Sequence, residues 1–393
     1  MGLQKELDEK RAEIRTDDYS MSIGEWISLY KDNELDIHPE FQRFFRWSEL
    51  QKTKLIESIL LGIPIPPIFV SQRGDGKWDV IDGLQRLSTI FQFAGILRTE
   101  DGMDKQPLIL EGTKYLPSLK GNVWDEEVAT RVKATPYQMP LPFEDDIIQA
   151  EVTPLTEAQQ RYIKRAKIAV SIILRESDEI SKYELFQRLN TGGSQLSDQE
   201  VRNAILIMTN RDMFKWMQEL AQDSNFKDCV TEILTERAIQ EQYDLEQVLR
   251  FLALRNIAED KLSKIGSDMN EFLTEEMINK AQSTDFDFEE ETSAFKQTFE
   301  ILASVTSENS FKRYDPVKDQ FTGRFRIPAF ETIASGVGFH YKRLHSNRLE
   351  IKKIIKKLWQ DEEFIHYSQG GMNASFRIPK LIPLGRKYFG EET

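Results

Sequence analysis

The sequence contains little cysteine and little histidine, and this scarcity excludes several kinds of site. Its 393 residues include one cysteine, Cys229, and four histidines. A single cysteine cannot form an internal disulfide, and no Cys/His spacing in the chain fits zinc. His340 and His345 lie in a helical pattern, which favours two surface histidines over a metal-binding pair. This composition suits a reducing cytoplasm.

Long apolar runs and several common catalytic motifs are also absent. No stretch is apolar enough to cross a membrane, and the charged residues 1–15 do not resemble a signal peptide. The sequence lacks G-x-x-x-x-G-K-[ST], H-E-x-x-H and G-x-S-x-G, which argues against a P-loop enzyme, a zincin and an α/β-hydrolase. We therefore expect a cytoplasmic protein.

The chain does have the length for two domains and an uneven distribution of charge. Its net charge of −13 argues against general coating of nucleic acid. Residues 311–393, however, carry 16 Lys and Arg against 9 Asp and Glu. The cluster at 341–357 is compatible with phosphate binding, but the solvated face of an amphipathic helix is the simpler interpretation.

Capping signals predict helices in the first half of the chain. Ser48 with Gln51 forms a capping box, and the helix that follows should end at Gly62. A second helix is predicted over residues 156–166. Residues 1–18 read as a mobile or helical charged lead-in.

Strand patterns lie between these helices. Residues 68–70 and 77–81 predict a hairpin around the turn at 74–76, and the β-branched stretch 168–174 predicts a buried strand. Residues 98–155 are rich in loops and give no clear elements.

From about residue 206 the apolar spacing is almost wholly helical. The sequence thus predicts an α+β protein with a mixed α/β domain at 1–205 and a helical domain at 206–393. Within the second domain, residues 325–328 and 376–379 both read Phe-Arg-Ile-Pro, which suggests extended segments that end in proline.

The most informative stretch is the passage from an apolar run into a helix. Val80 and Ile81 read as the end of a buried strand, and helical spacing begins directly after Asp82 and Gly83. The first N–H groups of such a helix attract anions, and Arg86 lies one turn in. Alternatively, this is only a capped helix with Arg86 in solvent.

Three groups of polar residues lie beside turns. They are Gln42, Arg43 and Arg46; Asp82, Gly83, Gln85 and Arg86; and Glu184, Gln187, Arg188, Asn190, Thr191, Gly192 and Gly193. Each group has a purely structural alternative, such as a helix cap or a turn. Together they offer arginine forks, amides and two carboxylates, the groups that a nucleoside triphosphate with Mg²⁺ requires.

These motifs resemble the N-terminal domain of the GmrSD-type restriction endonucleases, within the wider ParB/sulfiredoxin-like group. The similar segments are 38–47, 55–67, 81–89 and 186–203, in the same order and over about half the chain. The family's D-G-Q-Q-R reads D-G-L-Q-R here, because Leu84 replaces the first glutamine.

The resemblance implies a ParB-like α/β domain that binds and often hydrolyses nucleoside triphosphates in bacterial or archaeal defence against foreign or modified DNA. It assigns Asp82, Gln85 and Arg86 to the catalytic part of a nucleotide site. Gln42 and Arg43 lie opposite. The remaining binding positions are Arg46, Gly83, Gln187, Arg188, Asn190, Thr191, Gly192 and Gly193. Glu184 resembles a metal-contacting glutamate of ParB, although Leu185 replaces the asparagine that follows it there.

Restriction members of the family carry a second, His-Asn-His nuclease domain, and the helical half has too few suitable histidines to form one. We therefore do not expect this chain to cleave DNA. Its expected partners are DNA and a nuclease or modification protein, and the sequence leaves a homo-oligomer open. The leading hypothesis is a Mg²⁺-dependent NTPase that acts as a sensor or regulator. The alternative is a non-enzymatic DNA-binding or adaptor protein that keeps only the fold.

Overall fold

The computed structural model describes residues 16–37, 47–99, 102–134, 152–174, 197–344 and 348–390. The chain divides into two compact units, Met1–Gly192 and Gly193–Thr393. Helix α8 (Asp198–Thr209) lies whole in the second unit, whereas a boundary after residue 205 would divide it. Its apolar face is buried there against α9 (Arg211–Ala221).

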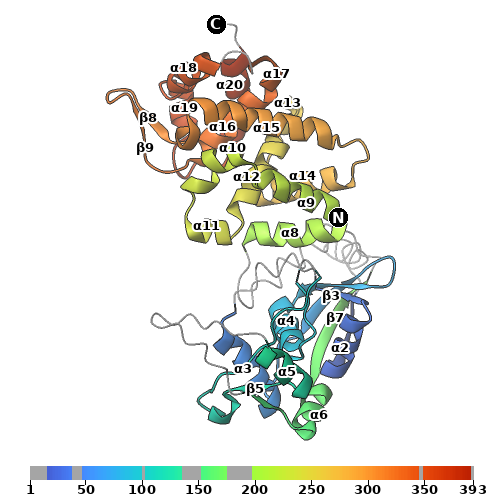
Figure 1. Ribbon diagram of the computed structural model, residues 1–393. Helices are drawn as coiled ribbons and strands as arrows, with labels where there is room; N and C mark the ends of the chain where they lie inside the picture. The colour runs from blue at the N-terminus through green and yellow to red at the C-terminus, as the bar shows by residue number, and fades with distance from the viewer. Residues whose placement is uncertain are drawn as a thin grey trace. The chain divides into compact units, whose positions relative to one another are not determined.

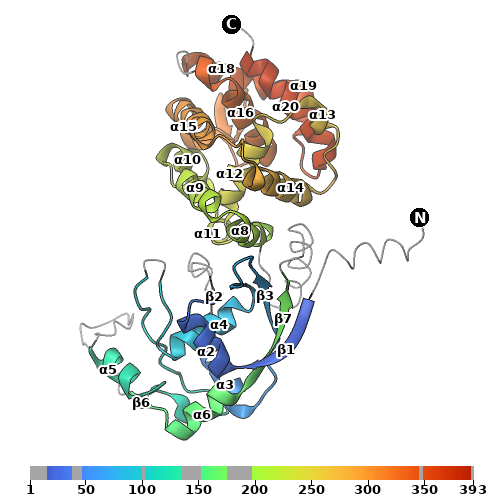
Figure 2. The same ribbon diagram turned by 90° about the vertical axis from the view of Figure 1, so that its right-hand side faces the viewer.

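A five-stranded mixed sheet forms the centre of the first unit. Its strands are β1 (Thr16–Ser22), β7 (Lys167–Ile173), β3 (Ile68–Gln72), β4 (Trp78–Asp82) and β2 (Leu35–Asp36), in that spatial order. The pairs β1–β7 and β3–β4 are antiparallel, and the pairs β7–β3 and β4–β2 are parallel. Figure 2 shows β1 and β7 side by side at one edge of the sheet. The predicted hairpin and the predicted strand at 168–174 are confirmed. A separate parallel pair joins β5 (Asn122–Val123) to β6 (Thr153–Pro154).

The described helices of the first unit include those predicted after Ser48, after Gly83 and over residues 156–166. They are α2 (Ile23–Lys31), α3 (Glu49–Leu61), α4 (Leu84–Phe93), α5 (Glu126–Ala134) and α6 (Glu157–Arg165). The Ser48 side chain accepts the N–H of Gln51, and the Gln51 side chain accepts the N–H of Ser48. Helix α3 ends at Gly62, whose φ of 70° is left-handed. Thr156 caps α6 with the same reciprocal bonds.

Two elements differ from the sequence prediction. Residues 16–18 belong to strand β1 and not to a mobile or helical lead-in. The side chains of residues 16–20 are exposed, so the strand has no apolar alternation and is held by its ladder with β7. Helix α5 lies in the stretch 98–155, for which no clear elements were predicted.

Aromatic side chains pack α2 and α4 next to the sheet. Trp26 and Phe91 are fully buried. The ring of Trp26 meets the ring of Trp78 edge-on at 6.4 Å, and Tyr30 stacks on Phe91 at 4.4 Å. This packing fixes the position of α4, and with it the junction at Gly83, against the sheet.

The second unit is mostly helical, as predicted. After α8 and α9 its helices are α10 (Ser224–Cys229), α11 (Glu236–Gln240), α12 (Tyr243–Leu254), α13 (Glu259–Leu262), α14 (Met269–Gln282), α15 (Phe288–Val305), α16 (Ile327–Phe339), α17 (Tyr341–Leu344), α18 (Arg348–Leu358), α19 (Glu362–Tyr367) and α20 (Ala374–Gly390). One short hairpin, β8 (Arg313–Asp315) with β9 (Gln320–Thr322), projects from them (Figure 1). Among the described residues, no helix combines the length and the apolar character needed to cross a bilayer. The α+β prediction is confirmed.

The two Phe-Arg-Ile-Pro segments differ in structure. Arg326 of the first has extended backbone angles and α16 begins at the next residue, whereas residues 376–379 lie wholly inside α20, so the prediction of an extended segment is wrong for the second copy. Pro328 lies in the first turn of α16, where a proline needs no hydrogen-bond partner for its nitrogen. Pro379 lies inside α20. The two helices approach closely, since a Cβ on Gly336 of α16 would lie 2.7 Å from the carbonyl oxygen of Gly385 in α20.

Three arginines and two glutamates form a buried chain through α8, α12, α16 and α20. Arg202 donates to Glu246 at 2.6 Å, and Arg250 donates to Glu246 at 2.9 Å and to Glu331 at 2.7 Å. Arg377 donates two hydrogen bonds of 2.8 Å to Glu331. Burial raises the pKa of Glu246, but the charges of Arg250 and Arg202 outweigh this effect and hold the pKa below its usual value.

The basic stretch at 341–357 largely forms the amphipathic helix α18. Ile351, Ile354 and Ile355 are buried, whereas Lys352 and Lys353 are exposed. The stretch in α18 is therefore an amphipathic helix with its lysines toward solvent, which both interpretations allow.

His340 is half-buried and is not the surface side chain that we expected. Its Nε2 lies 2.9 Å from the backbone oxygen of Arg386, and burial lowers its pKa. His345 lies outside the described residues.

The buried thiol of Cys229 should be inert in the folded protein. Burial raises its pKa to about 12, so only about one thiol in 10⁴ is ionised at pH 8. We expect an aromatic disulfide reagent to label Cys229 at least about 100-fold more slowly in buffer than in concentrated urea. Rapid stoichiometric labelling in buffer would contradict this burial.

Candidate functional site

The site predicted from the sequence is the junction between β4 and α4. Val80 and Ile81 are buried in the strand, and α4 follows after the single residue Gly83. Gly83 occupies the N-cap position and offers no side chain to cap the first turn of α4. The predicted order of buried strand, glycine and helix is confirmed, and the N-terminus of a helix carries the partial positive charge that favours anions.

Gly83 is required at this junction for two reasons. Its φ of 97° is left-handed, which costs a residue with a side chain free energy. A Cβ at this position would also overlap Cδ1 of Ile68 and would lie 3.4 Å from Nη2 of Arg86. The absence of a side chain therefore lets β3 and Arg86 approach the start of the helix.

Arg86 is directed at the protein's own backbone. Its Nη1 donates to the carbonyl oxygens of Pro66 at 2.5 Å and Pro67 at 2.9 Å, and its Nη2 donates to Asp82 Oδ2 at 2.8 Å. The Arg86 side chain is 11% exposed, whereas that of Asp82 is 43% exposed. The alternative that placed Arg86 in solvent is therefore wrong. Through these hydrogen bonds Arg86 links the segment before β3 to the end of β4.

A second arginine, which the sequence analysis did not identify, lies near the turn of the β3–β4 hairpin and binds an aspartate of β4. Arg73 donates to both oxygens of the buried Asp79 and, at 2.8 Å, to Asp36. Burial opposes the charge of Arg73, but the bonds to the two carboxylates raise its pKa above the usual value. Sequence spacing alone could not identify this cluster, because Asp36 lies 37 residues before Arg73.

Of the other predicted positions, the structure describes only Gln85. Gln85 lies half-buried in the first turn of α4, beside Arg86. Gln42, Arg43, Arg46, Glu184, Gln187, Arg188, Asn190, Thr191, Gly192 and Gly193 lie outside the described residues. The convergence of Arg43 with Arg86 therefore stays a prediction.

Metal ligands are sparse in the described part of the chain. Over these residues, no three His, Cys, Asp or Glu side chains are grouped so that they could hold a metal ion. Asp82 is the exposed carboxylate at the junction. Mg²⁺ often binds through one carboxylate together with substrate phosphates and water, and this single group is compatible with that mode.

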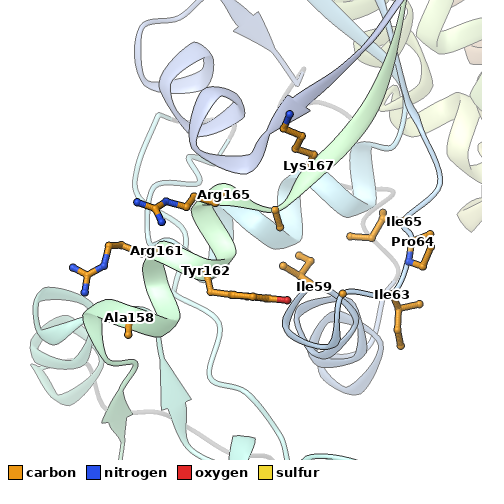
Figure 3. A pocket seen from close by; sticks show the side chains of 11 residues that line it. Ile59, Ile63, Pro64, Ile65, Ala158, Arg161, Tyr162, Arg165 and Lys167 are labelled. Carbon is orange, nitrogen blue, oxygen red and sulfur yellow. The ribbon is translucent and has the colours of Figure 1, made fainter.

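A cavity of about 570 Å³ lies between the end of α3 and helix α6. Ile59, Ile63 and Tyr162 are among its lining residues, and Figure 3 shows the Tyr162 side chain extending toward Ile59. Arg161 and Arg165 also line it, but Figure 3 shows their guanidinium groups directed away from Ile59 and Ile63. Because these charges do not converge, the cavity lacks the donor arrangement of a phosphate site.

The comparisons with known proteins bear on the unit that contains this junction. Residues 23–207 match the family model described as the GmrSD restriction endonuclease, N-terminal domain. No curated protein and no solved structure matches the chain.

Proposed function

We propose that this chain, whose residues 23–207 match the N-terminal domain of the GmrSD restriction endonucleases, is a component of a restriction-type system of DNA defence. In that system it binds and hydrolyses a nucleoside triphosphate and acts as a regulator. Its partners in this role are DNA and a nuclease or modification protein.

The junction at Gly83 is the observation that supports this proposal. It places an uncapped helix N-terminus, the fork of Arg86 and the carboxylate of Asp82 within one turn of chain. Backbone N–H groups at a helix start and an arginine fork are both suited to phosphate oxygens. Asp82 would serve as the protein's ligand to Mg²⁺, and the phosphates and water would supply the others.

The contacts of Arg86 suggest how a nucleotide would change the protein. A phosphate within reach of Nη1 would compete with the carbonyl oxygens of Pro66 and Pro67 for the same two N–H groups. Transfer of these bonds to phosphate would release the segment Gly62–Pro67 from the start of α4. Nucleotide binding would thereby alter an exposed loop, which a partner could recognise.

The test is Mg²⁺-dependent release of phosphate from ATP, GTP, CTP and UTP. Asp82→Ala and Arg86→Ala should each lower the rate at least about 100-fold, because each removes a group that acts on the phosphates. Arg161→Ala is the matched control, since Arg161 and Glu157 form an exposed pair with the same i, i+4 spacing in the same unit. Circular dichroism checks the folding of each variant.

Wild-type turnover no faster than that of Asp82→Ala would refute hydrolysis. The engagement of Arg86 by Asp82 and two carbonyl groups favours one second candidate, a non-hydrolysing adaptor in which these bonds serve the fold alone. A thermal shift separates the candidates further, because a ligand of the folded state must stabilise it. Stabilisation by nucleotide without turnover would indicate a nucleotide-binding adaptor. Absence of both would indicate an adaptor without a nucleotide.

A further inference from the structure

Lysines on α18 and basic residues on the hairpin β8–β9 lie on neighbouring parts of the second unit. We call them the basic surface; they are Lys352, Lys353, Lys356 and Lys357 of α18 and Arg313 and Lys318 of the hairpin. Five of these side chains are exposed, and Lys356 is half-buried. On α18 the lysines form two adjacent i, i+4 rows opposite the buried isoleucines.

The hairpin is attached to α18 through Lys356. The Lys356 ammonium forms a short ion pair with Asp319 and lies 5.0 Å from the centre of the Tyr314 ring. Tyr314 packs against Phe321 across the hairpin, and Arg313 lies at the next position of the strand and is exposed. Figure 1 shows the hairpin projecting from the helices near α18 and α19.

The carboxylates among these residues are engaged within the hairpin and the helix. Asp315 accepts the backbone N–H groups of Val317 and Lys318 at the turn, at 2.9 and 3.2 Å. Asp319 accepts the hydroxyl of Tyr314 at 2.6 Å in addition to its bond with Lys356. Glu350 pairs with Lys353 at 3.1 Å. Each of these three carboxylates thus has one oxygen engaged, and the six cations outnumber them, so that the surplus charge of this surface is positive.

The residue types on this surface point to one class of polyanion. Single-stranded nucleic acid is usually held by aromatic side chains on which bases stack. In the described parts of 311–324 and 348–358 no aromatic side chain is exposed. Lysine acts as a point charge toward phosphate, whereas base readout commonly uses the planar fork of arginine. We propose that the basic surface binds the phosphate backbone of duplex DNA without preference for sequence.

This inference rests on the proposed function only in the choice of DNA as the ligand. The charge, the exposure and the pairing of the lysines do not involve the junction at Gly83. DNA binding is therefore measured on the full chain without nucleotide. The Asp82→Ala variant should bind DNA as the wild type does, which separates failure of this inference from failure of the nucleotide hypothesis.

The experiment measures binding of a fluorescent 30-base-pair duplex by anisotropy between 50 and 200 mM salt. Replacing Lys352, Lys353 and Lys357 together by alanine should weaken binding at least about 10-fold. The slope of log K against log salt should shrink by roughly 2 to 3, because about 0.9 is lost for each phosphate contact. A duplex of different sequence should respond in the same way.

The matched control removes three exposed lysines elsewhere on the second unit: Lys215, Lys261 and Lys264, also replaced by alanine. It changes the net charge equally and should leave the affinity within about 2-fold. An equal loss in both triple variants, or no binding by the wild type at 50 mM salt, would overturn the inference. Tighter binding of the corresponding single strand, or competition by polyglutamate as effective as that by DNA, would show that the occupant is not duplex DNA.

Discussion

Replacing Glu331 by alanine should destabilise the second unit by about 3–5 kcal/mol, because it removes one partner from a buried ion-pair network. The Glu331 carboxylate is completely buried and receives hydrogen bonds from Arg250 and Arg377. Without it, two guanidinium groups on α12 and α20 would stay in the interior with fewer negative partners. Urea unfolding, followed by circular dichroism, measures the loss as a lower midpoint with an unchanged slope.

Two further variants separate the cost of an unpaired charge from the loss of packing. Glu308→Ala removes a glutamate that is 61% exposed and pairs with Lys312 at 3.4 Å, and it should change the free energy of unfolding by at most about 1 kcal/mol. Replacing Glu331, Arg250 and Arg377 together by apolar residues of similar volume should cost less than Glu331→Ala, because no member of the broken group stays charged. A loss below about 1 kcal/mol for Glu331→Ala would contradict the network's role.

Local signals in the sequence predicted the helices and strands around the site well. The capping box at Ser48, the glycine at the end of α3 and the β-branched run of β7 each act over a few residues, so their chemistry is visible in the sequence. The same holds for the buried strand, Gly83 and helix at the junction. Strand β1 has no such signal, because its exposed residues pair with a strand about 150 residues away.

The partners of the buried charges could not be predicted in this way. Arg86 lies one turn after Asp82, and this spacing was visible, but its bonds to Pro66 and Pro67 depend on where the chain returns 20 residues earlier. No feature of the sequence marked Arg202, Arg250 or Arg377 as buried, and Arg377 lay in a segment predicted to be extended. Their burial follows from the packing of four helices, which helical periodicity does not specify.

Gly83→Ala should cost about 2–4 kcal/mol, since it combines backbone strain with a steric overlap. A left-handed φ costs an alanine about 1–2 kcal/mol, and the new Cβ would overlap Cδ1 of the buried Ile68. Gly76→Ala is the matched control for the first effect, because Gly76 has a φ of 87° and no neighbouring atom within 4 Å of an added Cβ. Ile68→Val removes Cδ1 and should by itself cost about 0.5–1.5 kcal/mol.

In the double variant the overlap is absent, so its loss should be at least about 1 kcal/mol smaller than the sum of the losses caused by Gly83→Ala and Ile68→Val alone. If the loss in the double variant equals the sum of the two single losses within about 0.5 kcal/mol, the overlap with Ile68 is not the reason that position 83 requires glycine. The double variant also tests the nucleotide hypothesis, since it lacks the overlap with Ile68 while a methyl group stays at the start of α4, 3.4 Å from Nη2 of Arg86. If phosphate binds there, the double variant should keep the circular dichroism spectrum of the wild type, although it is less stable, and should lose most of its thermal shift with nucleotide.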